Sequence, residues 1–233
     1  KLEKTIVVSN IPGAAGAIGS DEFLKSKSDG FSALFHAEAP AYYPAMAQSD
    51  YTIDDFTYVY TMDMSPGVFV VNPDSEFETL DDVIKAVKDE GRKLKFSTSG
   101  IGDAWYMCIA LFQEYAGIEV EIVPYDSGKD AALGVMKNEV DVAGCGLCEA
   151  LDFINDDQLR ALTVFFDEDY TTSKGKEIPA VNNYLPEMDS DGWLPAGTWH
   201  SLLLQKDIDE EIRDAYVEAV EHAISKDEFK EYC

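Results

Sequence analysis

Two glycine-rich turns are the segments of this sequence best suited to hold a small molecule. One spans residues 10–19 and the other residues 97–104, and each follows a β-rich run and opens a helical pattern. Glycine lets the backbone approach a ligand, and unpaired N–H groups at a helix start attract anions. Ordinary turn chemistry is the alternative. The candidate residues are Pro12, Gly13, Ala14, Ala15, Gly16, Ser97, Thr98, Ser99, Gly100, Gly102, Asp103 and Ala104.

Neither turn carries a nucleotide-binding signature. No Gly-Lys-Ser/Thr follows them, which argues against a P-loop. Gly13, Gly16 and Gly19 have a loosely dinucleotide-like spacing, but the G-x-G start is missing. The sequence has no G-x-S-x-G elbow and no H-E-x-x-H, and its three histidines do not neighbour a nucleophile. Catalysis is therefore not indicated, and no metal or organic cofactor is expected.

Cys145 and Cys148 form an isolated C-x-x-C, which leaves three interpretations open. A zinc site would need a second pair or nearby histidines, and His36, His200 and His222 are all far away in the sequence. A redox site would need a thioredoxin-like context, which is missing. The alternatives are two reduced structural cysteines, which we favour, a local disulfide, or a metal or thiol function.

Composition and charge restrict the class of protein. The 233 residues, 46% of them hydrophobic, suffice for one large domain or for two lobes with a sizeable core. The net charge of −27 would repel nucleic acid and anionic membranes, and no basic patch is present. No apolar run reaches the roughly 18 residues of a membrane span. No signal peptide is visible, so targeting signals do not indicate the compartment.

Strand-like runs alternate with helical patterns, which predicts an α/β fold with a largely parallel sheet. Helices are expected around residues 80–87, with Thr79 as cap, around 108–115 and around 212–223. A loop-rich segment over 167–198 suggests a functional loop or a connection between lobes. The expected strands cover residues 5–9, 32–36, 58–62, 68–72, 94–98, 120–124, 140–143, 159–165 and 201–205.

Eight short segments match a known family in order and spacing, and together they cover nearly the whole chain. They read VVSNIPGAAGAIG (7–19), SDGF (28–31), DDFT (54–57), VFVVNP (68–73), KFSTSGIG (95–102), VPY (123–125), EVDV (139–142) and LRAL (159–162). As a set they resemble the substrate-binding proteins of the tripartite tricarboxylate transporter family.

The resemblance implies a bilobal periplasmic-binding (type II) fold, in which hinge strands at 68–72 and 201–205 join two α/β lobes. Lobe one would contain residues 1–70 and 204–233, and lobe two residues 71–203. The family's opening strand, loop and helix would lie upstream of Thr5 and are absent from this sequence. We expect a trimmed or cleaved chain; the alternatives are a strand supplied by a partner, or impaired binding.

The resemblance also implies a function: an extracytoplasmic solute-binding protein, not an enzyme, that captures a small carboxylate in an interlobe cleft for a membrane permease. The ligand would be an organic acid or an amino acid, held by the two turns, with Tyr125, Gly146 and Trp199 beside it. The expected location is the periplasm or the outer face of the cytoplasmic membrane, with or without a lipid anchor. Neither nucleic acid nor direct membrane insertion is expected. A ligand-sensing regulatory protein of the same fold is the main alternative, and a thiol-dependent enzyme is the third.

Departures from the family pattern bear on the ligand. Asp103 stands where the family commonly has Ser, and Tyr106 where it has His. Asp103 suits a helix cap. Alternatively, it faces the cleft and pairs with a ligand ammonium, which would favour a zwitterion over a di- or tricarboxylate. Residues 144–149 replace a family segment that usually reads FDNLPS, so contacts of its side chains are not carried over.

Overall fold

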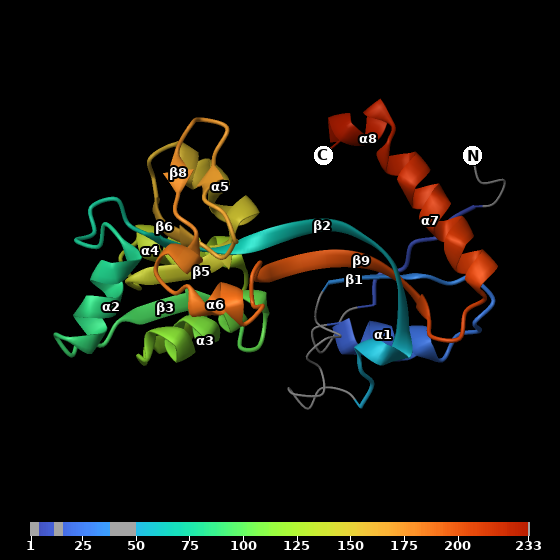
Figure 1. Cartoon of the computed structure of the whole chain (residues 1–233), viewed down its shortest axis with the longest axis horizontal. Helices are drawn as coiled ribbons and strands as arrows, with labels where there is room; N and C mark the ends of the chain where they lie inside the picture. Colours follow the sequence, from blue (N-terminus) through green and yellow to red (C-terminus); the bar gives the residue numbers. More distant parts are fainter. Residues whose placement is uncertain (1–4, 12–15, 38–49, 233) are drawn as a thin grey trace. The chain divides into compact units, whose positions relative to one another are not determined.

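The computed structural model describes residues 5–11, 16–37 and 50–232, and the chain divides into two units. Unit 1 contains Lys1–Asp63 and Trp199–Cys233, and unit 2 contains Met64–Thr198. The chain passes from one unit to the other within strand β2 (Phe56–Val71) and again near the start of strand β9 (Gly197–Gln205), as Figure 1 shows. The predicted lobe boundaries fall within these two strands and stay a prediction.

Unit 2 is built on a sheet whose central strands are parallel. Strand β3 (Lys95–Thr98) lies between β4 (Glu121–Pro124) and β5 (Val142–Gly146) and is parallel to both. Strand β2 pairs antiparallel with β5 and with β6 (Arg160–Val164). Parallel neighbours require crossover connections, which helices provide here. The predicted α/β fold is thereby confirmed, but its sheet is mixed and not largely parallel, because β2 pairs antiparallel with both of its partners in this unit.

Helices cover both faces of this sheet (Figure 1). Residues 68–71 of β2 are fully buried and alternate between two cores, because successive strand residues point to opposite faces. Phe69 and Val71 pack with α2 (Leu80–Lys88), α3 (Ala104–Ala116) and α6 (Glu187–Ser190). Val68 and Val70 pack with α4 (Gly128–Met136) and α5 (Leu147–Asn155). The remaining elements of unit 2 are β7 (Tyr170–Thr171), β8 (Glu177–Ile178) and η4 (Val181–Asn183).

Helix α2 begins at its predicted cap. Thr79 Oγ1 accepts from the N–H of Asp82 at 3.3 Å, and Asp82 Oδ2 accepts from the N–H of Thr79 at 2.8 Å, which forms a capping box. Hydrogen bonds from Thr79 lower the pKa of Asp82. Because the folded-state pKa is depressed, this carboxylate stabilises the fold above its unfolded pKa, about 3.9, and the contribution is lost as the pH falls through the folded value.

Thr79→Ala is expected to lower the free energy of unfolding by about 1 kcal/mol at pH 7, because the Asp82 N–H loses its acceptor. Thr79→Ser keeps the hydroxyl and should lose little. Asp82→Asn should also destabilise the protein at pH 7, and its effect should shrink as the pH falls below about 4. Urea denaturation measures all three variants. Equal stability of the serine and alanine variants would show that the cap is unimportant.

Unit 1 has a small core beside β9. Strand β1 (Leu34–His36) pairs antiparallel with β9, and Phe23, Phe56 and Leu203 are buried together. Helix α7 (Glu210–Ile224) is capped by Asp209, whose side chain accepts from the N–H of Glu211. The other elements of unit 1 are α1 (Ala17–Leu24), η3 (Ile53–Asp55) and α8 (Asp227–Tyr232).

Two strand predictions are wrong. Residues 5–9 form no strand, and Ile6, Val7 and Val8 are 70%, 80% and 82% exposed. β-branched residues favour a strand where neighbouring strands pack against them, and none of the described strands pairs with this segment. The separate strands expected over 58–62 and 68–72 are one continuous strand, β2, of 16 residues.

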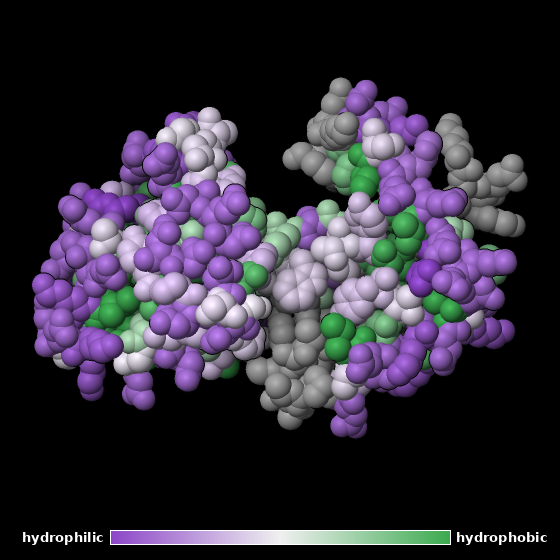
Figure 2. Space-filling model, viewed as in Figure 1, coloured by the Kyte–Doolittle hydropathy of each residue, from purple (hydrophilic) through white to green (hydrophobic). Residues whose placement is uncertain are grey.

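The surface agrees with the acidic composition. Hydrophilic residues predominate on the face of unit 2 seen in Figure 2, as expected for a net charge of −27. Among the described helices, none combines the length and the apolar character needed to cross a membrane. In the same part of the chain, no three His, Cys, Asp or Glu side chains gather as a metal site would require.

Candidate functional site

Three turns of unit 2 meet at one edge of its sheet. The parallel strands β4, β3 and β5 end at Pro124, Thr98 and Gly146, and helices α4, α3 and α5 begin shortly after them. In open α/β sheets, ligands bind outside the carboxyl ends of the strands. We call this the carboxyl edge, and it is the candidate site of unit 2.

Asp103 is the N-cap of α3. Its Oδ1 accepts from the N–H of Tyr106 at 2.7 Å and from Thr98 Oγ1 at 3.1 Å. Its Oδ2 accepts from the hydroxyl of Ser99. The capping prediction is confirmed, whereas pairing with a ligand ammonium stays a prediction. Since both carboxylate oxygens have partners within the turn, an ammonium would have to share them.

The turn before Asp103 brings main-chain groups close to the carboxyl edge. Gly102 has a φ of 86°, a conformation that side-chain-bearing residues rarely adopt. A Cβ on Gly100 would lie 3.9 Å from Asp103 Oδ2, its nearest contact among the described residues, so the backbone there is uncrowded. The first N–H groups of α3, beginning with Ala104, have no intrahelical acceptor. These amides suit an anion, although Asp103 already supplies one negative charge beside them.

Two predicted side chains point toward α4 and the residues just after it. The buried Ser97 donates its hydroxyl to the carbonyl of Ala131 at 2.9 Å, and Tyr125 donates its hydroxyl to Glu139 Oε2 at 2.9 Å. The pKa of Tyr125 is raised, chiefly by burial and secondarily by the Glu139 carboxylate. The Tyr125 ring also packs against the core beneath α4. Its role as a wall of the ligand site stays a prediction.

Gly146 ends β5, and two side chains lie against it. Glu149 Oε2 accepts from the N–H of Gly146 at 2.9 Å. A Cβ on Gly146 would lie 2.7 Å from Cζ2 of Trp105 and 3.0 Å from Glu149 Oε2, so only glycine leaves room for both. Sequence reasoning missed Trp105 and Glu149. The available signal for Glu149 is the departure of residues 144–149 from the family pattern.

In unit 1, two of the predicted binding residues are described. Gly16 precedes α1 with a φ of 88° and offers no side-chain cap, so the first N–H groups of that helix depend on other acceptors. Trp199 is half-buried in β9. Their role in ligand binding stays a prediction. The other predicted residues of this unit lie outside the described residues: Pro12, Gly13, Ala14 and Ala15.

None of the three described cysteines, Cys108, Cys145 and Cys148, forms a disulfide, and Cys145 and Cys148 are reduced thiols, as in the favoured interpretation. Cys145 is buried, and burial raises the pKa of its thiol far above the usual range. Cys148 is exposed, and Ser65 Oγ lies 3.3 Å from its sulfur. Cys145 therefore lacks the thiolate character that a redox or metal-binding pair would need.

Under native conditions, iodoacetamide is expected to modify Cys148 at least about tenfold faster than Cys145, because the thiolate is the reactive species and must be accessible. Peptide-resolved mass spectrometry at successive times would measure both rates. In urea the two thiols should react alike. Equal rates in the folded protein would contradict the burial of Cys145.

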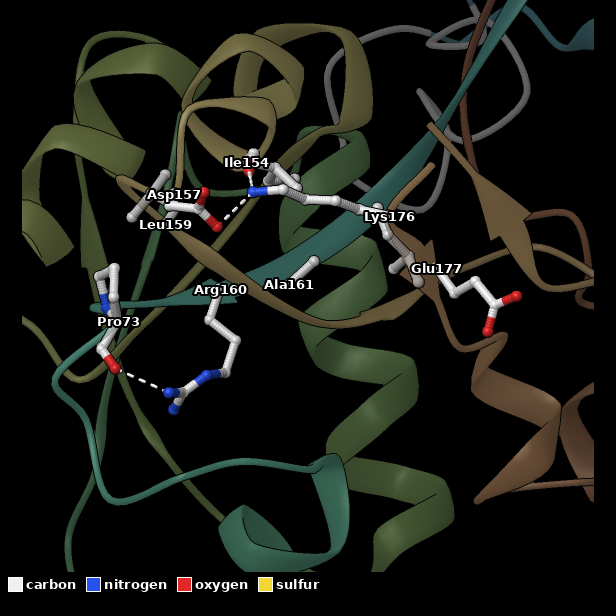
Figure 3. A pocket seen from close by; sticks show the side chains of 9 residues that line it. Pro73, Ile154, Asp157, Leu159, Arg160, Ala161, Lys176 and Glu177 are labelled. Carbon is white, nitrogen blue, oxygen red and sulfur yellow. Dashed lines mark hydrogen bonds and ion pairs between the residues drawn. The ribbon is translucent and has the colours of Figure 1, made fainter. Parts of the chain in front are cut away.

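A hollow of about 240 Å³ lies near the opposite edge of the sheet, and its cations are already bonded (Figure 3). Arg160 donates to three main-chain carbonyls of the loop after β2, those of Pro73, Ser75 and Phe77, at 2.7, 3.0 and 3.0 Å. Lys176 donates to the carbonyl of Ile154 and the carboxylate of Asp157. The side chains of Arg160 and Lys176 that line the hollow therefore already bond to groups of the protein, and the hollow lies where loops attach to the sheet.

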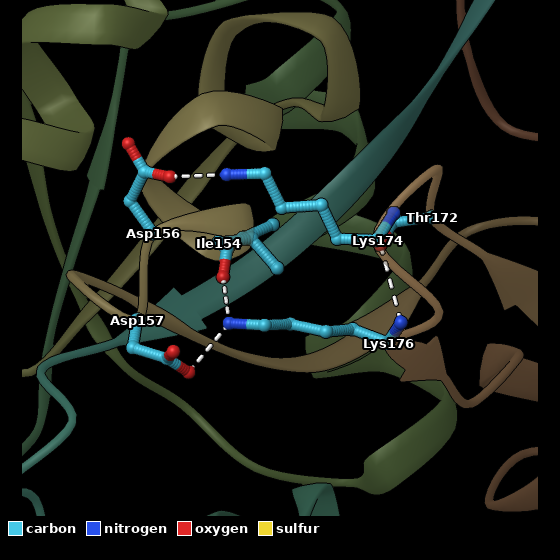
Figure 4. A network of polar contacts seen from close by, with 6 residues as sticks. All are labelled: Ile154, Asp156, Asp157, Thr172, Lys174 and Lys176. Atoms are coloured by element: carbon cyan, nitrogen blue, oxygen red, sulfur yellow. Dashed lines mark hydrogen bonds and ion pairs between the residues drawn. The ribbon is translucent and has the colours of Figure 1, made fainter.

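The β7–β8 hairpin is tied to the end of α5 by two lysines, as Figure 4 shows. Lys174 pairs with Asp156 at 2.6 Å, beside the Lys176–Asp157 pair. The Lys174 pair is largely exposed, and such pairs contribute little to stability because solvent screens them. This network positions the hairpin and adds no group to the carboxyl edge.

Comparison with known proteins gives one family match over the whole chain. The model of the tripartite tricarboxylate transporter family receptor (TctC) matches residues 1–233. A UPF0065 protein of Agrobacterium vitis is 27% identical over 229 residues, covering 96% of this chain and 63% of the relative. BugT of Bordetella pertussis is 25% identical over 217 residues, covering 91% and 64%. The chain thus spans less than two thirds of the length of these curated relatives.

Solved structures of similar fold cover almost all of the chain. A TctC solute-binding protein from Polaromonas, crystallised without ligand, superimposes with a TM-score of 0.82 at 20% identity, covering 97% of this chain and 75% of the other. MatC of Rhodopseudomonas palustris with bound malate gives 0.72 at 17%, covering 94% and 73%. A second R. palustris protein, with adipate, gives 0.71 at 18%, covering 97% and 74%. The predicted periplasmic-binding fold is thereby confirmed.

Proposed function

This chain belongs to the tripartite tricarboxylate transporter receptor family, and on that basis we propose that it is a solute-binding protein for a small carboxylate. It captures the ligand outside the cytoplasmic membrane and delivers it to a membrane permease. The proteins of similar fold that were solved with malate and with adipate support a carboxylate ligand. The family is one of receptors, and no catalytic step is proposed.

The observation that carries this proposal is the uncrowded turn around Gly100, where main-chain amides meet the start of α3. A helix start favours an anion by about 0.3–1 kcal/mol at exposed sites. Hydrogen bonds from N–H groups to a carboxylate are stronger than those between neutral groups. The overall charge of −27 opposes an anionic ligand, but salt screens exposed charges over about 8 Å. Local amides therefore dominate the affinity, and the net charge mainly slows association.

The proposed binding residues come from both units. They are residues 12–16 in unit 1 and residues 97–104 in unit 2, with Tyr125, Gly146 and Trp199 in contact with the ligand. Binding is through main-chain N–H groups, except at Pro12, which has none to donate. Strands β2 and β9, through which the chain passes between the units, are the proposed hinge. A ligand that binds one conformation more tightly shifts the population toward it by that difference in affinity.

A thermal-shift screen of the full-length protein against dicarboxylates, monocarboxylates and amino acids tests this function. A true ligand at 100 times its Kd should stabilise the folded state by about 2.7 kcal/mol, which appears as a rise in Tm. Calorimetric titration of each hit would confirm stoichiometric binding. A panel in which no carboxylate of any kind changes the Tm would overturn the proposal.

A further inference from the structure

The side chain of Glu149 places a negative charge at the start of two helices of the carboxyl edge. Glu149 is in the first turn of α5, and its Oε2 accepts from the N–H of Gly146, the residue before that helix. Its carboxylate also lies against α4. A Cβ on Gly128, the first residue of α4, would lie 2.6 Å from Glu149 Cδ and 2.8 Å from Oε1. Glycine at position 128 is therefore what allows this approach.

The indole of Trp105 fixes the other side of this arrangement. Trp105 is 7% exposed, and its ring lies beside Gly146, where the Glu149 carboxylate also approaches that glycine. Two glycines from different turns, Gly128 and Gly146, thus leave the space that the Glu149 carboxylate fills, and a buried aromatic ring adjoins it. A side chain packed on several sides in this way has little freedom to leave when a ligand arrives.

The chain's own carboxylates therefore occupy all three helix starts at this edge. Asp103 caps α3, and Glu149 lies at the starts of both α4 and α5. A helix start that already carries a carboxylate attracts a second anion less, and two carboxylates at short range repel each other strongly where water is excluded. One ligand carboxylate can reach the turn amides near Gly100, which precede α3, but a second one meets a carboxylate at every helix start of this edge.

We propose that Glu149, together with Asp103, determines the charge of the ligand. The inference rests on the proposed function and specifies its substrate class: a carboxylate with a single negative charge, whose other end is neutral or carries an ammonium group. Glu149 takes the position that a second ligand carboxylate would otherwise occupy at the start of α4. The ligand's own carboxylate is held by the uncrowded amides near Gly100.

Ligands matched in length and shape test this assignment. For chains of four, five and six carbons, calorimetry on the full-length protein would compare the dicarboxylate, its monoamide and the corresponding ω-amino acid. The wild type is expected to prefer the monoamide or the amino acid over the dicarboxylate by at least about tenfold in Kd. Glu149→Gln keeps the size and an acceptor for the Gly146 N–H, and it should reduce that preference about tenfold.

A matched control separates this local effect from the charge of the whole protein. Glu121 is exposed at the opposite end of β4. Glu121→Gln changes the net charge equally and should leave the ligand preference unchanged. Asp103→Asn is a second test at the same edge and should shift the preference in the same direction as Glu149→Gln. Asp103→Asn therefore still tests the proposal if Glu149→Gln folds poorly.

The possible outcomes distinguish this inference from the function beneath it. If no carboxylate binds the wild type, the proposed function fails, and the inference fails with it. If dicarboxylates bind the wild type as tightly as their monoamides, solute binding stands and the role of Glu149 is wrong. The same conclusion follows if Glu149→Gln and Glu121→Gln alter the preference equally.

Discussion

Phe69→Ala is expected to lower the free energy of unfolding of unit 2 by about 3–5 kcal/mol. Phe69 is fully buried in β2. Its ring makes edge-to-face contacts with Phe96, Phe112 and Phe165 at centroid distances of 5.4, 5.2 and 4.8 Å. Truncation removes all three contacts and leaves a cavity, which β2 cannot close because it is paired with both β5 and β6.

Urea denaturation would measure this loss, and hydrogen exchange at peptide resolution would locate it. Exchange should accelerate in α2 and α3, which pack on the same core. Phe31→Ala is the matched control, because Phe31 is 83% exposed and the same truncation there should change stability by no more than about 0.5 kcal/mol. Similar effects of the two substitutions would mean that Phe69 does not organise the core.

Elements determined by local chemistry could be predicted from the sequence. The cap of α2 depends on Thr79 and Asp82, which lie within one helical turn. Helix α3 likewise begins at Asp103 and ends at Gly117, which has a φ of 64°. Capping hydrogen bonds and left-handed glycines involve residues at most a few positions apart, so a pattern in the sequence is sufficient to predict them.

Features that depend on residues distant in the sequence could not be predicted in the same way. Residues 5–9 have the composition of a strand, but composition does not say whether another strand pairs with them. The approach of Glu149 to Gly128 depends on how α4 and α5 pack, and the contact of Trp105 with Gly146 depends on the pairing of β3 with β5. Each glycine looks like an ordinary turn residue until the side chain beside it is known.

This difference explains why only part of the candidate site could be predicted from the sequence. The turn around Gly100 could be identified because glycine and hydroxyl residues cluster there. The carboxylate of Glu149 could not, because it comes from a different turn and appears in the sequence as an ordinary first-turn acid of a helix. The amides that favour an anion were therefore predicted, and the carboxylate that limits how many anionic groups can bind was not.

Gly100→Leu is expected to weaken carboxylate binding at least about tenfold while leaving the folded state intact. Gly100 is half-exposed and does not have a positive φ, and an added Cβ would have no described neighbour closer than 3.9 Å. The backbone at Gly100 therefore accepts a Cβ without strain. The leucine side chain would project over the amides proposed to hold the ligand and block their approach to a carboxylate.

Because a folding defect would also reduce binding, the Tm of the ligand-free variant must stay close to that of the wild type for this test to count. Gly100→Ala adds only a methyl group and should weaken binding less than leucine does, so the loss of affinity should follow the size of the side chain. Asp103→Ala should behave differently. It removes the cap of α3 and should lower the Tm of the ligand-free protein, through a loss of about 1 kcal/mol. If Gly100→Leu binds every ligand as tightly as the wild type, this turn does not hold the carboxylate, and the amides that do so must belong to another part of the chain.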